Sequence, residues 1–306
     1  MEKDYVSKRS RSPPMKYTWL GKDGPKIPVL GMGTWLVGGR TRPDRSMDPE
    51  NVKALRHGIR LGMTFIDTAE MYSGGHAEEI VGTAIAGRRQ DVFVASKVHP
   101  HHFRYDDVLK ACERSLRRLK TPYLDLYQLH WPSRRVPIRE TMKAMERLVD
   151  DGKVRGIGVS NFDVKQTAEA QESLSRHEIA SNQIEYSVLR RGFGVCGERR
   201  SGVTPTADRE LKGILPFCER EGIGIIAYSP LALGAIFRGK PAEILSEVGN
   251  RCNKTISQVA LNWLISKPHL VAIPKSTSVN HLNENLGALG WKLSSRNAEY
   301  LMRRLG

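Results

Sequence analysis

Eight short runs of apolar residues, spread along the whole chain, constrain its fold more than any other feature. The runs are Val29-Leu30, Met63 to Ile66, Val92 to Ala95, Leu124 to Leu129, Gly156 to Val159, Ala180 to Ile184, Ile223 to Ala227 and Leu270 to Ile273. Continuous apolar runs are typical of strands buried on both faces, as in a parallel sheet covered by helices. Between the runs, apolar residues recur three or four positions apart, which is typical of amphipathic helices. Eight strand–helix units in 306 residues predict an α/β chain folded as a (β/α)8 TIM barrel.

Two of the helical segments have clear ends in the sequence. The apolar stripe from Val108 to Leu119 is preceded by Asp106-Asp107, which predict that the helix begins there. The stripe from Met142 to Val149 is followed by Gly152, which predicts the helix end.

The start of the chain predicts a hairpin and a basic arm. Tyr17 to Leu20 and Lys26 to Val29 flank a glycine-containing turn, which predicts a short β-hairpin that closes the bottom of the barrel. Residues 1–16 are basic and contain no apolar segment, so we expect a flexible N-terminal arm and not a secretory signal. Residues 17–306 are expected to form one domain that ends in a C-terminal helix, because no low-complexity linker divides them.

Composition narrows the classes of partner. The chain has 48 Lys and Arg against 33 Asp and Glu, a net charge of +15, but the basic residues are scattered and no nucleic-acid-binding motif accompanies them. A phosphate-bearing small ligand fits this charge better. No run approaches the ~18 apolar residues of a membrane-spanning helix, and the four cysteines are too scattered for a disulfide framework or a zinc site. We expect a cytoplasmic protein without nucleic-acid or membrane partners, either a monomer or a weak homo-oligomer.

Polar side chains follow seven of the apolar runs. They are Asp67, Lys97, His130, Ser160-Asn161, Gln183, Tyr228-Ser229 and Lys275-Ser276. In a (β/α)8 barrel the C-terminal ends of the strands meet at one rim, where reactive groups gather. Any one of these side chains has an ordinary structural explanation, such as a helix cap for Asp67 or a buried core position for His130. Seven together predict a functional site at that rim.

These residues stand in longer motifs that resemble those of the aldo-keto reductase family. The matching motifs are Gly31 to Trp35, Phe65 to Tyr72, Ser96-Lys97, Leu124 to Pro132, Gly152 to Phe162, Asn182 to Tyr186, Tyr228 to Gly234 and Ile273 to Ser276. The resemblance extends from about residue 30 to residue 305. It implies a barrel that binds a nicotinamide cofactor without a Rossmann domain and reduces small aldehydes and ketones to alcohols.

Four side chains at the predicted rim suit carbonyl reduction, and the resemblance gives them the same catalytic roles. Reduction needs a hydride on carbon and a proton on oxygen, and Tyr72 is the candidate proton donor. We expect the Lys97 ammonium to lower the pKa of the Tyr72 phenol, and the Asp67 carboxylate to keep Lys97 charged. By resemblance, His130 donates a hydrogen bond to the substrate oxygen and orients the carbonyl. The expected substrate contacts are Trp35, Tyr72, His130 and Trp131.

The resemblance also implies a cofactor site at this rim. Ser160, Asn161 and Gln183 would hold the nicotinamide carboxamide, and Tyr228 would stack on the nicotinamide ring. The backbone of Ser229 to Gly234 would run alongside the pyrophosphate, with Gly234 allowing close approach. The full set of expected cofactor contacts is Gly33, Thr34, Trp35, Asp67, Ser160, Asn161, Gln183, Tyr228, Ser229, Pro230, Leu231, Gly234, Lys275, Ser276, Thr277, His281, Glu284 and Asn285.

The expected cofactor is NADP(H), because Lys275 and Ser276 resemble the family's contacts to the adenosine 2′-phosphate. His281 departs from the family pattern, which often has an arginine six residues after the lysine. A neutral imidazole holds a phosphate less firmly than a guanidinium does. We therefore expect NADP(H) with weakened discrimination, so that NAD(H) also serves.

Other sequence features carry less weight. The glycine pattern Gly192 to Gly197 matches a dinucleotide-binding fingerprint, but no helix start follows it, so we discard that interpretation. His99, His101 and His102 lack a spaced carboxylate partner and are interpreted as a loop without a metal ion. Arg190 to Ala207 are expected to form a long loop that either closes on an anionic ligand or is simply solvated.

The turn after the candidate proton donor also departs from the family pattern. Ser73 to Gly75 follow Tyr72, with His76 next in the chain, and we expect the two glycines to form the turn.

Two other function classes stay open at the level of the sequence. A metal-dependent barrel hydrolase would also place His and Asp at strand ends, but it needs several ligands around one ion, where this chain has Lys97. A nicotinamide-binding regulatory subunit, as the potassium-channel β subunits of the family partly are, would keep the barrel and use residual catalysis for sensing. The intact set of Asp67, Tyr72, Lys97 and His130 favours the enzyme.

Overall fold

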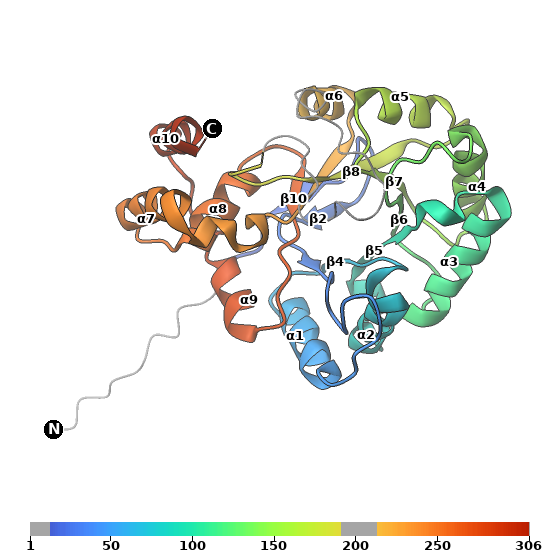
Figure 1. Cartoon of the computed structure of the whole chain (residues 1–306), viewed down its shortest axis with the longest axis horizontal. Helices are drawn as coiled ribbons and strands as arrows, with labels where there is room; N and C mark the ends of the chain where they lie inside the picture. The colour runs from blue at the N-terminus through green and yellow to red at the C-terminus, as the bar shows by residue number, and fades with distance from the viewer. Residues whose placement is uncertain (1–12, 191–212, 306) are drawn as a thin grey trace.

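The computed structural model describes residues 13–190 and 213–305, in which eight parallel strands form a barrel surrounded by helices (Figure 1). The strands are β3 (Met32–Gly33), β4 (Phe65–Asp67), β5 (Phe93–Val98), β6 (Leu126–Leu129), β7 (Ile157–Ser160), β8 (Ile179–Glu185), β9 (Gly224–Tyr228) and β10 (Leu270–Ala272). Their order in the sheet follows their order in the chain. Seven of the predicted apolar runs overlap a strand, and the first run, Val29-Leu30, lies just before β3.

The sheet closes between its first and last strands. Isolated parallel bridges join Leu30 to Ala272 and Gly33 to Lys275. The Gly31 N–H also donates to the Ala272 carbonyl oxygen at 2.9 Å. The predicted (β/α)8 barrel is therefore confirmed, and the predicted C-terminal helix is α10 (Ser295–Leu305).

Helices cover the outside of the barrel, each with an apolar face toward the strands (Figure 1). They are α1 (Asp48–Arg60), α2 (His76–Ile85), α3 (Tyr105–Leu119), α4 (Ile138–Asp150), α5 (Val164–Glu172), α6 (Ile214–Glu221), α7 (Gly239–Cys252), α8 (Ile256–Ile265) and α9 (Val279–Leu286), with short 3-10 segments η1 (Tyr72–Gly75), η2 (Arg89–Asp91), η3 (Pro100–His102) and η4 (Ala232–Phe237). Helix α4 ends as predicted, with Gly152 at a φ of +70° beyond it. Helix α3 begins one residue before Asp106, so Asp106-Asp107 lie inside its first turn and not before it. Carboxylates in a first turn interact favourably with the helix dipole.

The N-terminal hairpin closes the end of the barrel where the strands begin. Strands β1 (Tyr17–Trp19) and β2 (Lys26–Pro28) pair antiparallel, as predicted. Leu20 and Ile27 each expose only 1% of their surface, and they pack with residues of the barrel interior, including Phe65. The predicted closure of the barrel bottom is thus confirmed.

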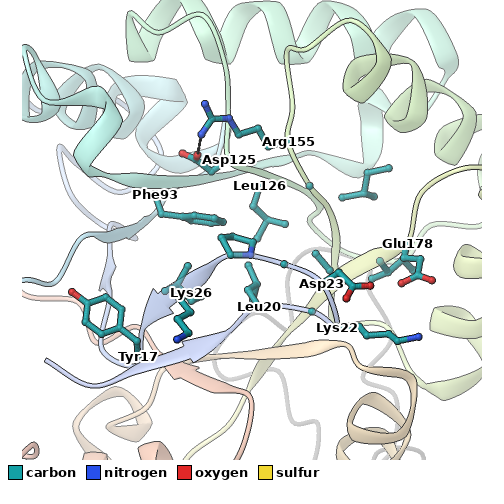
Figure 2. A pocket seen from close by; sticks show the side chains of 18 of the residues that line it. Tyr17, Leu20, Lys22, Asp23, Lys26, Phe93, Asp125, Leu126, Arg155 and Glu178 are labelled. Carbon is teal, nitrogen blue, oxygen red and sulfur yellow. Dashed lines mark hydrogen bonds and ion pairs between the residues drawn. The ribbon is translucent and has the colours of Figure 1, made fainter.

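A cavity of about 540 Å³ lies between this hairpin and the first residues of several strands (Figure 2). Asp23 of the hairpin lines one side, and Phe93 and Leu126 line the other. The charge of Asp125 in this cavity is compensated, because Arg155 donates to it at 3.2 Å. The polar residues that end the strands lie at the opposite end of the barrel, so this cavity is separate from the predicted site.

Some predictions concern residues outside the described ranges. Residues 1–12 of the predicted arm lie there, as do residues 191–207 of the predicted loop and the pattern Gly192 to Gly197. Lys16, at the end of the predicted arm, donates from Nζ to the Ile265 carbonyl oxygen at 3.1 Å. Within the described ranges, no helix combines the length and the apolar character needed to cross a membrane.

Candidate active site

Lys97 in β5 is the centre of a buried hydrogen-bond cluster. Its side chain is fully buried. Its Nζ donates to Asp67 Oδ2 at 2.7 Å, to the Thr68 carbonyl oxygen at 2.9 Å and to the Tyr72 hydroxyl oxygen at 3.1 Å. The three N–H groups of the ammonium therefore each have one acceptor. Because the Tyr72 oxygen accepts from Lys97, its own O–H hydrogen remains available for a different acceptor.

Parallel strand pairing brings these three side chains together. Asp67 ends β4 and is paired with Ala95 of β5, two residues before Lys97. The chain then continues along β5, where the Glu70 N–H donates to the Lys97 carbonyl oxygen at 3.3 Å. It turns into η1 at Tyr72, which places the phenol beside the Lys97 ammonium.

Burial controls protonation in this cluster. Burial lowers the pKa of Lys97, and the Asp67 carboxylate opposes that shift. Burial also raises the pKa of the Tyr72 phenol well above its usual value, and Asp67 raises it further. The sequence predicts a Tyr72 pKa lowered by Lys97. The net shift is instead upward, with desolvation of the phenolate as its largest cause. The phenol keeps its proton throughout the neutral pH range, as a proton donor requires.

His130, directly after β6, lies beside Tyr72. The two rings meet edge to face with centroids 5.6 Å apart, and the imidazole stacks on Trp131 with centroids 3.9 Å apart. Burial and the charge of Lys97 hold the pKa of His130 well below its usual value, so the ring is neutral. Its Nδ1 is buried and has no hydrogen-bond partner among the described residues. Only Nε2 is left to face a ligand.

The side chains expected at the carboxamide form a connected set. Tyr228 donates from its hydroxyl to Asn161 Oδ1 at 2.9 Å, and Asn161 Nδ2 donates to Ser160 Oγ at 3.0 Å. Gln183 Nε2 donates to Asp67 Oδ1 at 2.7 Å. The structure therefore joins the expected cofactor residues directly to the Lys97 cluster.

The expected contacts from the first strand also reach this cluster. Thr34 is fully buried, and both its N–H and its hydroxyl donate to the Asp67 carbonyl oxygen, at 3.0 and 2.9 Å. Gly33 ends β3, and Trp35 follows with 41% of its surface exposed. Trp35 is thus placed on the rim beside the cluster.

The segment expected at the pyrophosphate has an unusual backbone. Ser229, Leu233 and Gly234 have φ values of +47°, +51° and +86°. Pro230 is buried, Leu231 is half-buried and Leu233 is exposed. No atom lies within 4 Å of the position that a Cβ at Gly234 would take, so a ligand can approach the backbone closely there.

The residues expected at the 2′-phosphate lie at the start of α9. Lys275 and Thr277 are exposed, and Ser276 Oγ donates to the Ser278 carbonyl oxygen at 3.0 Å. Ser278 caps α9 by accepting from the His281 N–H. A lysine next to a helix N-terminus is suited to binding phosphate.

Two expected adenine contacts lie farther along α9. Glu284 accepts from the Thr255 hydroxyl at 2.9 Å through its side chain, and Asn285 is only 4% exposed. Nothing in the hydrogen bonding of these two residues singles them out as ligand contacts.

Two buried carboxylates near the site were not predicted from the sequence. Glu78 is fully buried, accepts from Ser96 Oγ at 2.6 Å and pairs with Arg118 at 2.6 Å, so it connects α2 to the residue before Lys97. Glu70 accepts from the His99 N–H at 2.7 Å. A charged residue inside an apolar helical stripe, as Glu78 is between Ala77 and Ile80, could have indicated a buried ion pair.

The histidine-rich segment is a loop after β5, as predicted. His99 caps the short 3-10 turn η3, with its Nδ1 accepting from the His101 N–H at 3.2 Å. His102 Nδ1 lies 2.9 Å from Glu70 Oε1, so the expectation that these histidines lack a carboxylate partner is wrong. Among residues 13–190 and 213–305, no group of three or more His, Cys, Asp or Glu side chains is arranged to hold a metal ion.

Comparison with known proteins gives consistent matches over nearly the whole chain. The model of the aldo/keto reductase family matches residues 29–303. The methylglyoxal reductase YeaE of Escherichia coli (strain K12) is 39% identical, with 88% of each chain covered. The glyoxal reductase of Bacillus subtilis (strain 168) is 32% identical, with 90% of this chain and 88% of that one covered.

Two solved structures are similar in both fold and sequence. The thermostable aldo-keto reductase Tm1743 has a TM-score of 0.86 and 43% identity, with 95% of this chain and 100% of that one covered. An aldo-keto reductase from Klebsiella pneumoniae, in complex with NADPH, has a TM-score of 0.81 and 37% identity, with 95% of each chain covered.

Proposed function

The chain belongs to the aldo/keto reductase family and is an oxidoreductase, and from this premise we propose that it reduces aldehydes and ketones to alcohols with NADPH as the reductant. The observation that carries the proposal is the contact between Lys97 Nζ and the Tyr72 hydroxyl oxygen at 3.1 Å. This contact leaves the Tyr72 hydrogen available while it places a positive charge where the phenolate will form.

Proton transfer from Tyr72 completes the reduction. When bound, the reduced nicotinamide supplies a hydride for the carbonyl carbon. Tyr72 gives its hydroxyl hydrogen to the carbonyl oxygen, so that C=O becomes CH–OH and the phenol becomes a phenolate. The Lys97 ammonium stabilises that phenolate, and Asp67 holds the ammonium in place at 2.7 Å. A proton from solvent then restores the phenol.

His130 orients the carbonyl in this proposal. Its lowered pKa keeps the imidazole neutral, so it donates a hydrogen bond without competing with Tyr72 as the acid. The carbonyl oxygen would accept from both the Tyr72 O–H and the His130 Nε2–H. The two rings lie next to each other, edge to face, with centroids 5.6 Å apart.

The polar groups around Asp67 fit a nicotinamide carboxamide, which needs both donors and acceptors. Gln183 donates a side-chain N–H to Asp67, and its side-chain oxygen can accept a hydrogen bond from the carboxamide. Ser160 and Asn161 supply a hydroxyl and an amide beside it. The hydroxyl of Tyr228 is fixed by Asn161, which holds the aromatic ring in one orientation for stacking.

The residues around the start of α9, expected at the 2′-phosphate, support NADPH as the cofactor. Lys275 supplies an exposed positive charge next to the capped N-terminus of α9, which suits the 2′-phosphate that distinguishes NADPH from NADH. His281 is exposed on the same helix, and an imidazole binds phosphate less firmly than a guanidinium does. We therefore propose a preference for NADPH with NADH as a weaker alternative.

Short dicarbonyl compounds are the proposed first substrates to test. Two relatives bear the names methylglyoxal reductase and glyoxal reductase. Trp35 and Trp131 supply large apolar walls next to the proposed proton donor, and such walls favour small organic carbonyls over highly charged ones.

Oxidation of NADPH, followed by its absorbance with a panel of aldehydes, tests the proposal. We expect consumption with methylglyoxal or glyoxal and an alcohol as product, unaffected by a chelator. Loss of turnover on chelation would favour a metal-dependent barrel enzyme. NADPH binding without consumption by any carbonyl would favour a regulatory subunit.

Three general properties belong to the same proposal. The chain is proposed to act in the cytoplasm, as a monomer or a weak homo-oligomer. Residues 17–306 are proposed to be one domain behind a flexible arm.

A further inference from the structure

The chain immediately after Tyr72 takes a strained course. Ser73, Gly74 and Gly75 follow with φ values of +53°, +65° and +95°. Backbone in this region persists only where surrounding contacts hold it. A Cβ at Gly75 would also lie 2.7 Å from Arg118 Nε, so a larger residue here would require the Arg118 side chain to shift. The position of Tyr72 therefore depends on contacts that anchor the segment after it.

His76 supplies a double anchor at the end of this segment. The residue is 2% exposed, its Nε2 lies 2.9 Å from Asp48 Oδ1 and its Nδ1 lies 2.8 Å from Glu79 Oε2. Ionised carboxylates only accept hydrogen bonds, so each ring nitrogen must carry a hydrogen to satisfy both contacts. The geometry thus calls for an imidazolium and not a neutral imidazole.

The charges around His76 support that protonation state. Its hydrogen bond lowers the pKa of Glu79, so this carboxylate is ionised at neutral pH. Asp48 also faces the ring, at 2.9 Å from Nε2. Cations also lie near the ring. Arg45 is paired with Glu79 at 3.1 Å, Arg118 with Glu78 and Arg114 with Glu70. Arg117 and Lys120 line the same cavity as His76.

The anchor connects two parts of the proposed site. Asp48 begins α1 and ends the long connection that starts with Trp35 after β3. A second tie lies beside it, because Ser73 Oγ is 2.9 Å from the Val37 carbonyl oxygen and 2.7 Å from that of Gly39. The segment after Tyr72 is thus fastened to the connection that carries Trp35 at two points.

We propose that His76 is a positioning residue for Tyr72: as an imidazolium bridging Asp48 and Glu79, it sets where the phenol lies against Lys97. This proposal rests on the proposed reductase function, since it concerns the proton donor of that reaction. His76 itself does not contact substrate. Displacement of a reacting group by about 1 Å through a remote change costs on the order of 100-fold in rate.

Nitrogen NMR of the protein labelled with 15N-histidine tests the protonation state directly. The His76 resonances are assigned by their absence in His76→Gln. At pH 7 we expect both ring nitrogens to show the shifts of an imidazolium. The shifts of a neutral tautomer would overturn the proposal, and this measurement needs no active variant.

Kinetics test the positioning role. In His76→Gln the cation is lost, and the donors of the amide lie on one nitrogen and not at the two ring positions that face Asp48 and Glu79. We expect kcat for carbonyl reduction to fall about 10- to 100-fold, with the KM for NADPH within about twofold of wild type. The matched control is His177→Gln, because His177 also faces a carboxylate, Asp150, at 3.3 Å, but lines the cavity at the opposite end of the barrel. The control should keep the wild-type kcat.

The solvent deuterium isotope effect separates positioning from a loss of stability. A misplaced phenol makes proton transfer more rate-limiting, so the isotope effect on kcat should increase in His76→Gln at a temperature where the variant is folded. A wild-type kcat and isotope effect in the folded variant would overturn the proposal. If His76→Gln does not fold, Asp48→Asn serves instead, because it retains an acceptor oxygen and removes one of the two charges. It should lower kcat by a smaller factor with the same increase in isotope effect, and wild-type values would again overturn the proposal.

The same measurements on Tyr72→Phe keep the two proposals apart. If Tyr72→Phe turns over like wild type, the reductase mechanism itself fails. If Tyr72→Phe is inactive and His76→Gln is unaffected, only the positioning role fails.

Discussion

Gln183 donates its side-chain N–H to Asp67 at 2.7 Å, so a residue expected at the cofactor also fixes the carboxylate that holds Lys97. Both oxygens of Asp67 are thereby engaged. We expect Gln183→Leu to raise the KM for NADPH and to lower kcat together, because a hydrogen bond to a buried charge contributes about 1.5 to 3 kcal/mol. Steady-state kinetics with NADPH as the varied substrate measures both effects. A change in KM alone would mean that the bond to Asp67 has no catalytic consequence.

Removal of the Tyr72 hydroxyl should abolish reduction and leave cofactor binding intact. A positioned general acid contributes about 100- to 10,000-fold, so kcat of Tyr72→Phe should fall by that order. The Kd for NADPH, from fluorescence titration, should stay within about twofold. Tyr300→Phe is the matched control, since its hydroxyl bonds Glu247 on the surface between α10 and α7. Equal kcat values for the two variants would refute the assigned acid.

The pH dependence of reduction should be controlled by Lys97 on the alkaline side. Burial lowers the pKa of Lys97 and raises that of Tyr72, so on raising the pH the ammonium is lost before the phenol. We expect kcat to be flat through neutral pH and to fall with a midpoint below 10.5, the ordinary pKa of a lysine. In Lys97→Arg, which stays charged, the alkaline fall should move to higher pH. A fall that is unchanged in this variant would assign it to another group.

The ion pair of Arg118 with Glu78 should be important for stability, because Glu78 is fully buried. Removal of one partner from a buried pair leaves an uncompensated charge and costs about 3 to 5 kcal/mol, which we expect for Arg118→Met in urea unfolding at pH 8. Burial already raises the pKa of Glu78, and loss of Arg118 raises it further. Protonation then removes the buried charge, so the deficit should be smaller at pH 5 than at pH 8. A deficit independent of pH would contradict this account, and the double variant with Glu78→Gln should recover part of the loss.

Cofactor selectivity should improve in His281→Arg. A guanidinium on α9 adds a charge-assisted contact to a phosphate, so we expect the KM for NADPH to fall by about tenfold and that for NADH to stay unchanged. Lys275→Ala should have the opposite effect on NADPH. Parallel changes for both cofactors would show that these residues do not contact the 2′-phosphate.

The sequence was sufficient to predict the barrel, because seven of the eight strands overlap a short apolar run that packing buries on both faces, and the remaining run lies just before β3. Asp67 and Lys97 were also predictable, since the ends of adjacent parallel strands must meet. The direction of the Tyr72 pKa shift was not predictable, because desolvation depends on how the folded chain covers the ring. The contacts of His76 and Glu78 could not be predicted either, since they join α2 to other elements that are adjacent only in the folded barrel.

The division between strand ends and loops has a consequence for how such an enzyme diversifies. Asp67 and Lys97 are built into the paired strands themselves, whereas Trp35 and Trp131 follow strands and stand on connections at the rim. Insertions or substitutions in those connections can change which carbonyl compounds enter the site, while the positions of Asp67 and Lys97 in the strands stay the same. New substrate ranges can therefore arise on this scaffold without the chemistry having to be invented again.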